Sequence, residues 1–323
     1  MLIVVSPRVR DDYATRIREI AAAAELAVPA LGGDGAVAWS HDPAAADVCC
    51  FSEDLWQDAA LRTAVLPQVF RIERLKWFHT FSAGTDSPAF RQIVERGTVL
   101  TNSSGASAPS IAQYVLAMML HRVKRMDDWH AAQQRREWAP VQTSELTGQT
   151  AGIIGTGAIG TAVARLAQAF GMRVLGMRRS EAPAAHVDET LPRARLRELL
   201  QRSDFVVLAC PLTSETERLI GEDELRAMKP TATLINVARG RIVDEAALIT
   251  ALREDWIAGA CLDVFATEPL PAASPLWSLP NAIVTPHNSG YSPLNNARAM
   301  AIFLDNLGRF VRGEPLRNVV ELE

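Results

Sequence analysis

The chain has few cysteines, and their spacing argues against two functional classes. Four cysteines occur in 323 residues, and none stands in the C-x-x-C arrangement of metal sites and redox-active disulfides. Each lies in an apolar run, and two adjacent residues on a strand point to opposite faces. We therefore expect no metal site, and buried free thiols in a reducing compartment, at Cys49, Cys50, Cys210 and Cys261.

The chain also lacks a long hydrophobic run and an excess of basic charge. Its longest apolar stretch, residues 20–31, is interrupted by Glu25 and Pro29 and is too short to cross a membrane. The N-terminus has neither the basic start nor the apolar core of a signal peptide. A net charge of −4 gives no electrostatic basis for binding nucleic acid. We expect a cytoplasmic protein with no membrane or nucleic-acid partner.

What the chain has in abundance is apolar sequence arranged in alternating strands and helices. Its length and its hydrophobic fraction of 48% predict two domains with sizeable cores. Alternation of this kind indicates parallel sheets covered by helices on both faces, the doubly wound α/β class. We predict helices at residues 13–26, 158–170 and 295–311. The predicted strands are 2–5, 37–39, 48–51, 75–81 and 99–101, then 151–154, 173–177, 205–208, 233–237, 258–262 and 282–285.

One helix, predicted over residues 107–126, is apolar around most of its circumference. A helix of this kind must be buried widely, either within one domain or at an interface. Because it leads from the first set of strands to the second, both alternatives stay open. The interface alternative predicts a homodimer.

A glycine motif follows the first strand of the second set. Gly155, Gly157 and Gly160 form G-x-G-x-x-G, with the strand 151–154 before it and a helical pattern after it. This arrangement presents backbone N–H groups and a positive helix end to a pyrophosphate. The sequence therefore predicts dinucleotide binding here.

The end of the second strand of this unit predicts which dinucleotide is bound. An acidic residue that binds the ribose hydroxyl of NAD is expected about 20 residues after the first glycine. The chain instead has Arg178, Arg179 and Ser180. Arginine binds phosphate in a bidentate manner, which favours NADP over NAD. The alternative is a solvent-exposed arginine pair without a ligand.

Three further segments end strands and carry reactive side chains. They place Arg239, Glu268 and His287 at the carboxyl edge of one predicted sheet, where open α/β sheets bind ligands. Hydride addition to a keto carbon leaves a developing alkoxide, which His287 can protonate. Glu268 would hold the imidazole and stabilise its charged form. Arg239 offers two donors to the carboxylate and carbonyl oxygens of a keto acid.

At this point the ordered motifs resemble the D-2-hydroxyacid dehydrogenase family over nearly the whole chain. They are G-T-G-x-I-G, P-L-T-x-x-T, N-V-A-R-G, L-D-V-F-x-x-E-P and T-P-H. The resemblance implies a Rossmann NAD(P)-binding domain, residues 102–289, inserted in a flavodoxin-like substrate domain, residues 1–101 and 290–323. It also implies an active site in the cleft between them.

The resemblance also implies roles for individual residues. The family's arginine, histidine and glutamate correspond to Arg239, His287 and Glu268. Its aspartate that meets the nicotinamide amide corresponds to Asp263. Substrate would be bound by Ser82, Ala83, Gly84, Arg239 and His287. Cofactor would be bound by Gly155, Thr156, Gly157, Ala158, Ile159, Gly160, Arg178, Arg179, Ser180, Pro211, Thr216, Val237, Ala238, Asp263 and Gly290.

Two positions depart from the family pattern. Ala209 stands where relatives commonly have histidine, so a cofactor contact is absent there, and Asn288 replaces a usually aliphatic residue beside His287. Neither touches the three catalytic candidates. Side-chain specificity is expected from the loops that vary, at Phe51-Ser52, Ser82–Gly84 and Tyr291, with Trp138 in the polar segment 127–138 as a further candidate.

These features predict an NADP-preferring 2-keto acid reductase of D specificity, with NAD as a second cofactor. A dedicated glyoxylate or hydroxypyruvate reductase is one form of this function. The candidate side-chain loops carry no Lys or Arg, so a small monocarboxylic keto acid is preferred over a dicarboxylate. The alternative from another class is a nucleotide-sensing interaction protein of the corepressor type.

Overall fold

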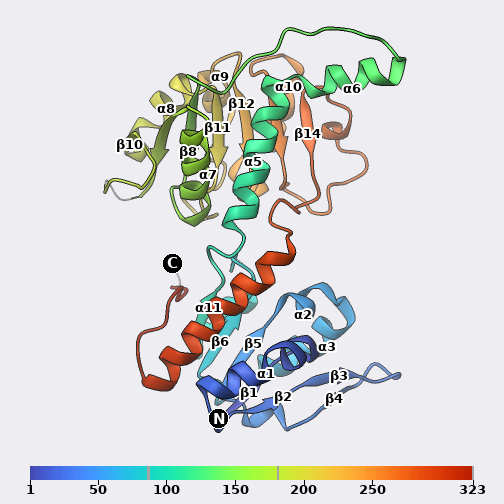
Figure 1. Ribbon diagram of the computed structural model, residues 1–323, viewed down its shortest axis with the longest axis vertical. Helices are drawn as coiled ribbons and strands as arrows, with labels where there is room; N and C mark the ends of the chain where they lie inside the picture. The colour runs from blue at the N-terminus through green and yellow to red at the C-terminus, as the bar shows by residue number, and fades with distance from the viewer. Residues whose placement is uncertain (86–87, 180–181, 322–323) are drawn as a thin grey trace. The chain divides into compact units, whose positions relative to one another are not determined.

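The computed structural model describes residues 1–85, 88–179 and 182–321 (Figure 1). It divides into two compact units. Unit 1 comprises Met1–Ala106 and Ser292–Glu323, and unit 2 comprises Ser107–Tyr291. The divisions lie five and two residues beyond the expected positions 101 and 289 (106 − 101 and 291 − 289). The first division falls directly before the helix that opens unit 2.

Unit 1 is built on a five-stranded parallel sheet of order β2-β1-β5-β6-β7. In chain order this is 2-1-3-4-5, the flavodoxin-like arrangement. A separate antiparallel hairpin joins β3 (Pro29–Leu31) to β4 (Val37–Trp39). The sheet strands are β1 (Leu2–Val4), β2 (Glu25–Ala27), β5 (Val48–Phe51), β6 (Trp77–Thr80) and β7 (Val99–Asn102).

Helices cover both faces of this sheet. The long α11 (Pro293–Arg312) and α1 (Pro7–Ile20) pack on one face, where Cys50 and Trp77 are buried with Phe303. On the other face, Cys49 is buried beneath α2 (Glu53–Gln57), α3 (Ala59–Val69) and α4 (Pro88–Glu95). The opposite placement of the two adjacent cysteines is as predicted, and all four cysteines are buried and free.

Unit 2 contains a seven-stranded parallel sheet of order β10-β9-β8-β11-β12-β13-β14. In chain order within the unit this is 3-2-1-4-5-6-7, so the order reverses between β8 and β11, where such sheets bind dinucleotides. The strands are β8 (Thr150–Ile154), β9 (Arg173–Met177), β10 (Glu189–Leu191), β11 (Phe205–Leu208), β12 (Thr233–Asn236), β13 (Gly259–Leu262) and β14 (Ala282–Val284).

The helices of unit 2 also form two layers. The sheet face that carries Ile153 and Val207 packs against α5 (Ala108–Val123) and α7 (Ala158–Ala169). The opposite face packs against α8 (Leu196–Arg202), α9 (Glu222–Ala227) and α10 (Glu245–Arg253). A further helix, α6 (Met126–Arg135), follows α5 after a left-handed residue at Arg125.

The secondary structure differs from the sequence predictions at several elements, among them the helix predicted over 107–126, which ends at Val123, and strand β3, which was not predicted. The first helix spans Pro7–Ile20 rather than 13–26, because Ser6 caps it by accepting a bond from the Val9 N–H and Pro7 occupies its first turn. Residues 25–27 form the edge strand β2 instead. Strand β10 was missed, since Leu191 is its one apolar residue.

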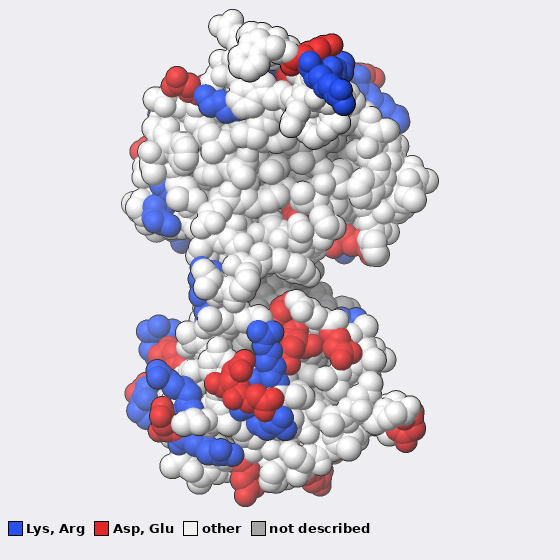
Figure 2. All heavy atoms as spheres, turned by 45° about the vertical axis from the view of Figure 1, so that its right-hand side comes forward, with Lys and Arg blue, Asp and Glu red and all other residues white. Residues whose placement is uncertain are grey.

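Charge is distributed without a single-sign surface on the face that Figure 2 shows of unit 1. Acidic and basic side chains lie intermixed there. No described helix has the length and apolarity that a membrane crossing requires. Within the described ranges, no three His, Cys, Asp or Glu side chains are placed to hold a metal ion.

Candidate active site

The glycine turn between β8 and α7 has the geometry that its spacing predicted. Gly155 has φ +98°, and a Cβ on it would lie 2.5 Å from the Cys210 backbone nitrogen at the end of β11. A Cβ on Gly160 would lie 2.0 Å from the Gly155 carbonyl oxygen. Only glycine therefore fits the first and third positions.

The second glycine faces open space. Nothing lies within 4 Å of a Cβ built on Gly157, which caps α7 without a side chain. The first N–H groups of a helix have no partner within it, so those of Ala158 and Ile159 can reach a phosphate. The buried Thr156 Oγ1 beside them has no partner among the described residues. This cradle fits a dinucleotide pyrophosphate.

The arginines at the end of β9 lie next to this turn. The Gly155 N–H donates to the Met177 carbonyl at 2.8 Å, so Arg178 begins directly beside the first glycine. Arg178 is half-buried and Arg179 is exposed. The third residue of the predicted phosphate-binding group, Ser180, lies outside the described residues. Two cationic side chains therefore begin at the strand end that faces the ribose in this fold class.

The segment after β11 forms a compact turn at the same sheet edge. The Thr216 hydroxyl donates to the Pro211 carbonyl at 2.6 Å, and the Thr213 N–H donates to Thr216 Oγ1 at 2.8 Å. Pro211 is exposed and Thr216 is half-buried. Because β11 adjoins β8 at the point where the strand order reverses, this turn flanks the glycine motif.

Arg239 is placed by a buried asparagine for which the sequence had suggested no role. The Asn236 side chain accepts from the Ala238 N–H at 3.1 Å and donates to the Arg239 carbonyl at 3.0 Å. The next residue, Gly240, is in such close contact that a Cβ on it would lie 1.8 Å from the Phe265 carbonyl carbon. The loop after β12 therefore packs directly against the loop after β13, which leads to Glu268.

Glu268 and His287 form a direct pair. His287 Nδ1 lies 2.8 Å from Glu268 Oε2, and the other oxygen, Oε1, accepts from the Phe265 N–H at 2.9 Å. A carboxylate partner makes Nδ1 the donor nitrogen, so Nε2 is left for a substrate. The two side chains are 49% and 36% exposed. The carboxylate thus fixes both the ring and its own loop.

Asp263 anchors the histidine loop, in addition to any role toward the cofactor. Its Oδ1 accepts from the Thr285 hydroxyl at 2.6 Å and the Asn288 N–H at 3.0 Å, and its Oδ2 accepts from the Ser289 N–H at 2.9 Å. The residue is 1% exposed. These bonds hold the loop that carries His287, whose φ is +52°. A non-glycine residue adopts this conformation at an energetic cost that its surroundings must offset.

The network extends to α5 through a tyrosine that the sequence did not single out. The Tyr114 hydroxyl lies 2.9 Å from Thr285 Oγ1. Because Thr285 donates its one proton to Asp263, its oxygen accepts from Tyr114. Burial raises the pKa of the Tyr114 phenol well above its ordinary value, so this donor stays protonated. Gly290 packs nearby, since a Cβ on it would lie 3.3 Å from Ser107 Cβ.

The predicted substrate turn lies in unit 1, after β6. The Ser82 N–H donates to Thr80 Oγ1 at 3.2 Å, its hydroxyl donates to the Gly84 carbonyl at 2.9 Å, and Asn102 holds the Ala83 carbonyl at 3.0 Å. The other expected specificity residues of this unit are unavailable to a ligand. Phe51 is fully buried, and Ser52 is 1% exposed with its hydroxyl 2.6 Å from Asp54 Oδ1.

A glycine cradle that fits a dinucleotide and a histidine bound by a carboxylate lie on one sheet edge, as in oxidoreductases that use a nicotinamide cofactor. More narrowly, the chain belongs to the D-isomer specific 2-hydroxyacid dehydrogenase family. The model of that family's NAD-binding domain matches residues 116–289, more than half of the chain.

Relatives and solved structures agree with this membership. The chain is 38% identical over 264 residues to a glyoxylate reductase of Korarchaeum cryptofilum, covering 77% of each chain. It is 39% identical over 260 residues to a glyoxylate reductase of Thermococcus gammatolerans, again covering 77% of each. A family member from Aeromonas salmonicida superposes with a TM-score of 0.82 at 30% identity, covering 100% of this chain and 99% of that one.

A second solved structure carries a cofactor. It is a D-isomer specific 2-hydroxyacid dehydrogenase from Xanthobacter autotrophicus Py2 in complex with NADPH and MES. Its TM-score is 0.79 at 28% identity, covering 99% of this chain and 97% of that one.

Proposed function

We propose that the protein is an NADPH-preferring reductase that converts small 2-keto acids to D-2-hydroxy acids. The observation that carries the proposal is the His287–Glu268 pair at 2.8 Å, on the same sheet edge as the Arg239 loop and the glycine cradle. The glyoxylate reductases among the relatives support this substrate class.

The residues of unit 2 divide the chemistry among them. A bound nicotinamide supplies the hydride that is added to the keto carbon. His287 Nε2–H then gives its proton to the oxygen that becomes the hydroxyl, so one hydride and one proton complete the reduction. Glu268 stabilises the imidazolium before transfer and keeps Nε2 directed outward. The Arg239 guanidinium holds the substrate carboxylate and polarises the carbonyl.

The NADP preference rests on Arg178 and Arg179. Guanidinium groups bind a 2′-phosphate through charge-assisted, bidentate hydrogen bonds, and no acidic residue takes the place that would favour the free ribose hydroxyl. Loss of one such contact costs about 1.5–3 kcal/mol, or about ten- to a hundredfold in affinity. Replacing Arg178 by Asp should therefore reverse the preference toward NADH.

The size of the substrate follows from what surrounds its carboxylate. The Ala83–Gly84 turn offers backbone amides to one carboxylate. The candidate loops provide no cation for a second one, and a buried unpaired carboxylate is costly. Since Phe51 and Ser52 are buried, Ser82 and Tyr291, which is 68% exposed, are left to contact the substrate side chain.

We further propose a homodimer formed through unit 2. The outer face of α5 exposes Ala117 and leaves Met118 half-buried, and α6 exposes Met126 and Trp129. Trp138, in the segment after α6, is 97% exposed. Exposed large apolar side chains on consecutive elements of one domain are candidates for an interaction surface.

Steady-state kinetics test the enzymatic proposal. Glyoxylate, hydroxypyruvate, oxaloacetate and 2-ketoglutarate are each assayed with NADPH and with NADH, and the product chirality is determined. We expect a monocarboxylate with NADPH to give the highest kcat/KM. The His287→Ala variant should lose several orders of magnitude in kcat and still bind NADPH, whereas the exposed His130→Ala control should not change. A dicarboxylate with the highest kcat/KM would contradict the proposed substrate size. Equal use of NADH would contradict the NADPH preference, and an active His287→Ala enzyme would contradict the role of His287.

A further inference from the structure

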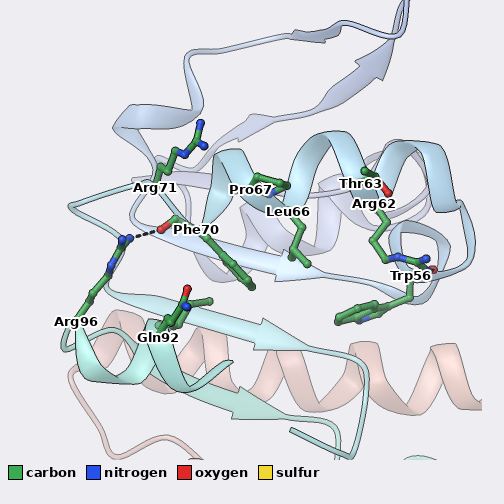
Figure 3. A pocket seen from close by; sticks show the side chains of 10 residues that line it. Trp56, Arg62, Thr63, Leu66, Pro67, Phe70, Arg71, Gln92 and Arg96 are labelled. Carbon is green, nitrogen blue, oxygen red and sulfur yellow. Dashed lines mark hydrogen bonds between the residues drawn. The ribbon is translucent and has the colours of Figure 1, made fainter. Parts of the chain in front are cut away.

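A pocket in unit 1 has no part in the reaction proposed above. It lies between α3 and α4, has a volume of about 510 Å³, and is lined by ten residues, among them Trp56 (Figure 3). That volume is in the range of sites for small organic molecules. We refer to it as the α3–α4 pocket.

The body of the pocket is apolar. Leu66 projects from α3, Phe70 follows directly at the end of that helix, and Trp56 lies at one end of the pocket (Figure 3). Ile93 of α4 also lines it. Beneath them is an aromatic cluster, in which the rings of Trp56 and Phe90 are 6.0 Å apart. A ligand must therefore bring an apolar body, because a small hydrated ion would gain nothing from these walls.

The rim of the pocket is cationic. Arg62 lies at the end near Trp56 and donates to its carbonyl, while Arg71 and Arg96 lie at the opposite end (Figure 3). Arg96 donates to the Phe70 carbonyl, which fixes its guanidinium at the rim and leaves further N–H donors for a ligand. No acidic residue is among the ten that line the pocket, and none of these three arginines forms a salt bridge within the described part of the chain.

We propose that the α3–α4 pocket binds an amphipathic organic anion, a carboxylate with an aromatic or branched apolar body. The carboxylate binds at Arg71 and Arg96, and the body lies along Leu66 and Phe70 toward Trp56. Guanidinium groups bind carboxylates in a bidentate manner and also stack on aromatic rings, so this rim suits both parts of such a ligand.

The pocket is linked to the substrate turn by one shared acceptor. The Trp56 indole N–H donates to Thr80 Oγ1 at 3.1 Å, and the Ser82 N–H donates to the same oxygen at 3.2 Å. An occupant that moves the indole therefore changes the bond that holds Ser82. This link rests on the proposed function, because Ser82 begins the turn to which we attribute carboxylate binding.

Binding is tested on the full-length protein saturated with NADPH, with 2-naphthoate as the probe. We expect its addition to shift the indole N–H resonance of Trp56, identified by its loss in Trp56→Phe. Affinity should fall at least about tenfold in the R71Q/R96Q variant, as for the loss of a charge-assisted bond. The R8Q/R10Q variant removes the same charge from exposed positions on α1, on the other sheet face, and should bind as the wild type does. Neutral naphthalene-2-methanol should bind more weakly than 2-naphthoate.

Three results would overturn the site: equal affinity in R71Q/R96Q, equal affinity for the neutral analogue, or an unmoved Trp56 resonance. The link is tested separately by the KM for glyoxylate with and without 2-naphthoate. A change that disappears in R71Q/R96Q supports it. A change that persists in that variant, or no change despite binding, refutes the link. Because binding is read from resonances, failure of the proposed function leaves the binding result intact.

Discussion

His79 is a buried neutral histidine whose tautomer is fixed by its neighbours. The Ser103 hydroxyl donates its one proton to the Thr80 carbonyl at 3.2 Å, so His79 Nε2, which lies 3.1 Å from Ser103 Oγ, carries the proton and donates to that oxygen. The other nitrogen of the neutral ring, Nδ1, is then an acceptor, so the Thr101 hydroxyl donates to it at 2.8 Å while Thr101 Oγ1 accepts from Trp77 Nε1, also at 2.8 Å. Both ring nitrogens of His79 and the hydroxyls of Thr101 and Ser103 therefore have partners, and a second proton on the ring would break the bond that Thr101 donates to Nδ1.

This burial predicts an acid-labile fold. Burial lowers the pKa of His79 to about 3 from its ordinary 6.5. As the pH falls from about 6.5 toward 3, the unfolded chain takes up a proton that the folded chain does not, so stability is lost by up to about 1.4 kcal/mol per pH unit. Denaturant unfolding at pH 4 to 6.5 should show a shallower pH dependence in His79→Gln than in the exposed control His41→Gln. If the free energy of unfolding varied with pH equally in both variants, His79 would not be a cause of the acid lability.

The anchor of the loop that carries His287 gives a second residue-scale prediction. Thr285→Val removes one donor to the buried Asp263 and the acceptor of Tyr114, and a lost bond of this kind costs about 1–3 kcal/mol. We expect kcat to fall because the His287 loop loses its position, with little change in NADPH affinity. Tyr114→Phe removes only the outer bond and should have a smaller effect. Equal, wild-type kcat in both variants would show that the network does not position His287.

At the scale of elements, the strand–turn–helix unit β8–α7 separates two functions of glycine. Gly160 is required by packing, since its Cβ would overlap the Gly155 carbonyl, whereas Gly157 borders open space. Gly160→Ala should lower the free energy of unfolding by about 1–3 kcal/mol, as overpacking does, and also weaken NADPH binding. Gly157→Ala should keep its stability and lose affinity only, because the added methyl group meets the phosphate.

Thermal unfolding and NADPH titration of these two variants distinguish the roles. A Gly160→Ala variant as stable as the wild type would contradict the proposed clash with the Gly155 carbonyl. An unchanged affinity of Gly157→Ala for NADPH would show that the pyrophosphate does not bind at this glycine.

Helix α5 shows that an apolar sequence pattern predicts burial of a helix but does not identify the surface that buries it. Its all-round apolar sequence suited burial within a domain or between subunits. Most of its apolar residues are buried inside unit 2, where α5 and α7 share one cluster with the sheet, and Met119 is fully buried. The dimer proposal therefore depends on the half-exposed outer face, and a charge at Met119 would disrupt the core rather than an interface.

At the scale of the whole molecule, the difference between the buried Met119 and the half-exposed Met118 gives a prediction about assembly. Met118→Asp should convert the dimer to a monomer while unit 2 stays folded, because the side chain is half-exposed. The control Gln57→Asp, at an exposed position on α2, should remain dimeric. Sedimentation at micromolar concentration with circular dichroism is the measurement. A monomeric wild type, or a dimeric and folded Met118→Asp protein, would contradict the proposal.

Much of the architecture was predictable because its signals are local. Strand-ending segments and the glycine spacing predicted two parallel α/β units, and the rule that parallel strands share a carboxyl edge brought Glu268 and His287 together, as observed. Strands that contain polar residues were less predictable. Strand β2 begins with Glu25 and β10 with Glu189 and Thr190, so neither gives the continuous apolar run by which strands of the same length, β1 and β14, were predicted.

By itself, the sequence determined the fold class, the glycine cradle and the pairing of Glu268 with His287, since each depends on residues close in the chain or on a general rule of sheet geometry. Only the tertiary structure decided what holds these residues in place. Tyr114 and Thr285 are 171 positions apart, and nothing in their local patterns predicts a shared bond. The buried Asp263 carboxylate anchors backbone amides, and Phe51 and Ser52 belong to the core rather than to a substrate pocket. Burial and hydrogen-bond partners are set by which elements pack together, and that packing is a property of the folded chain.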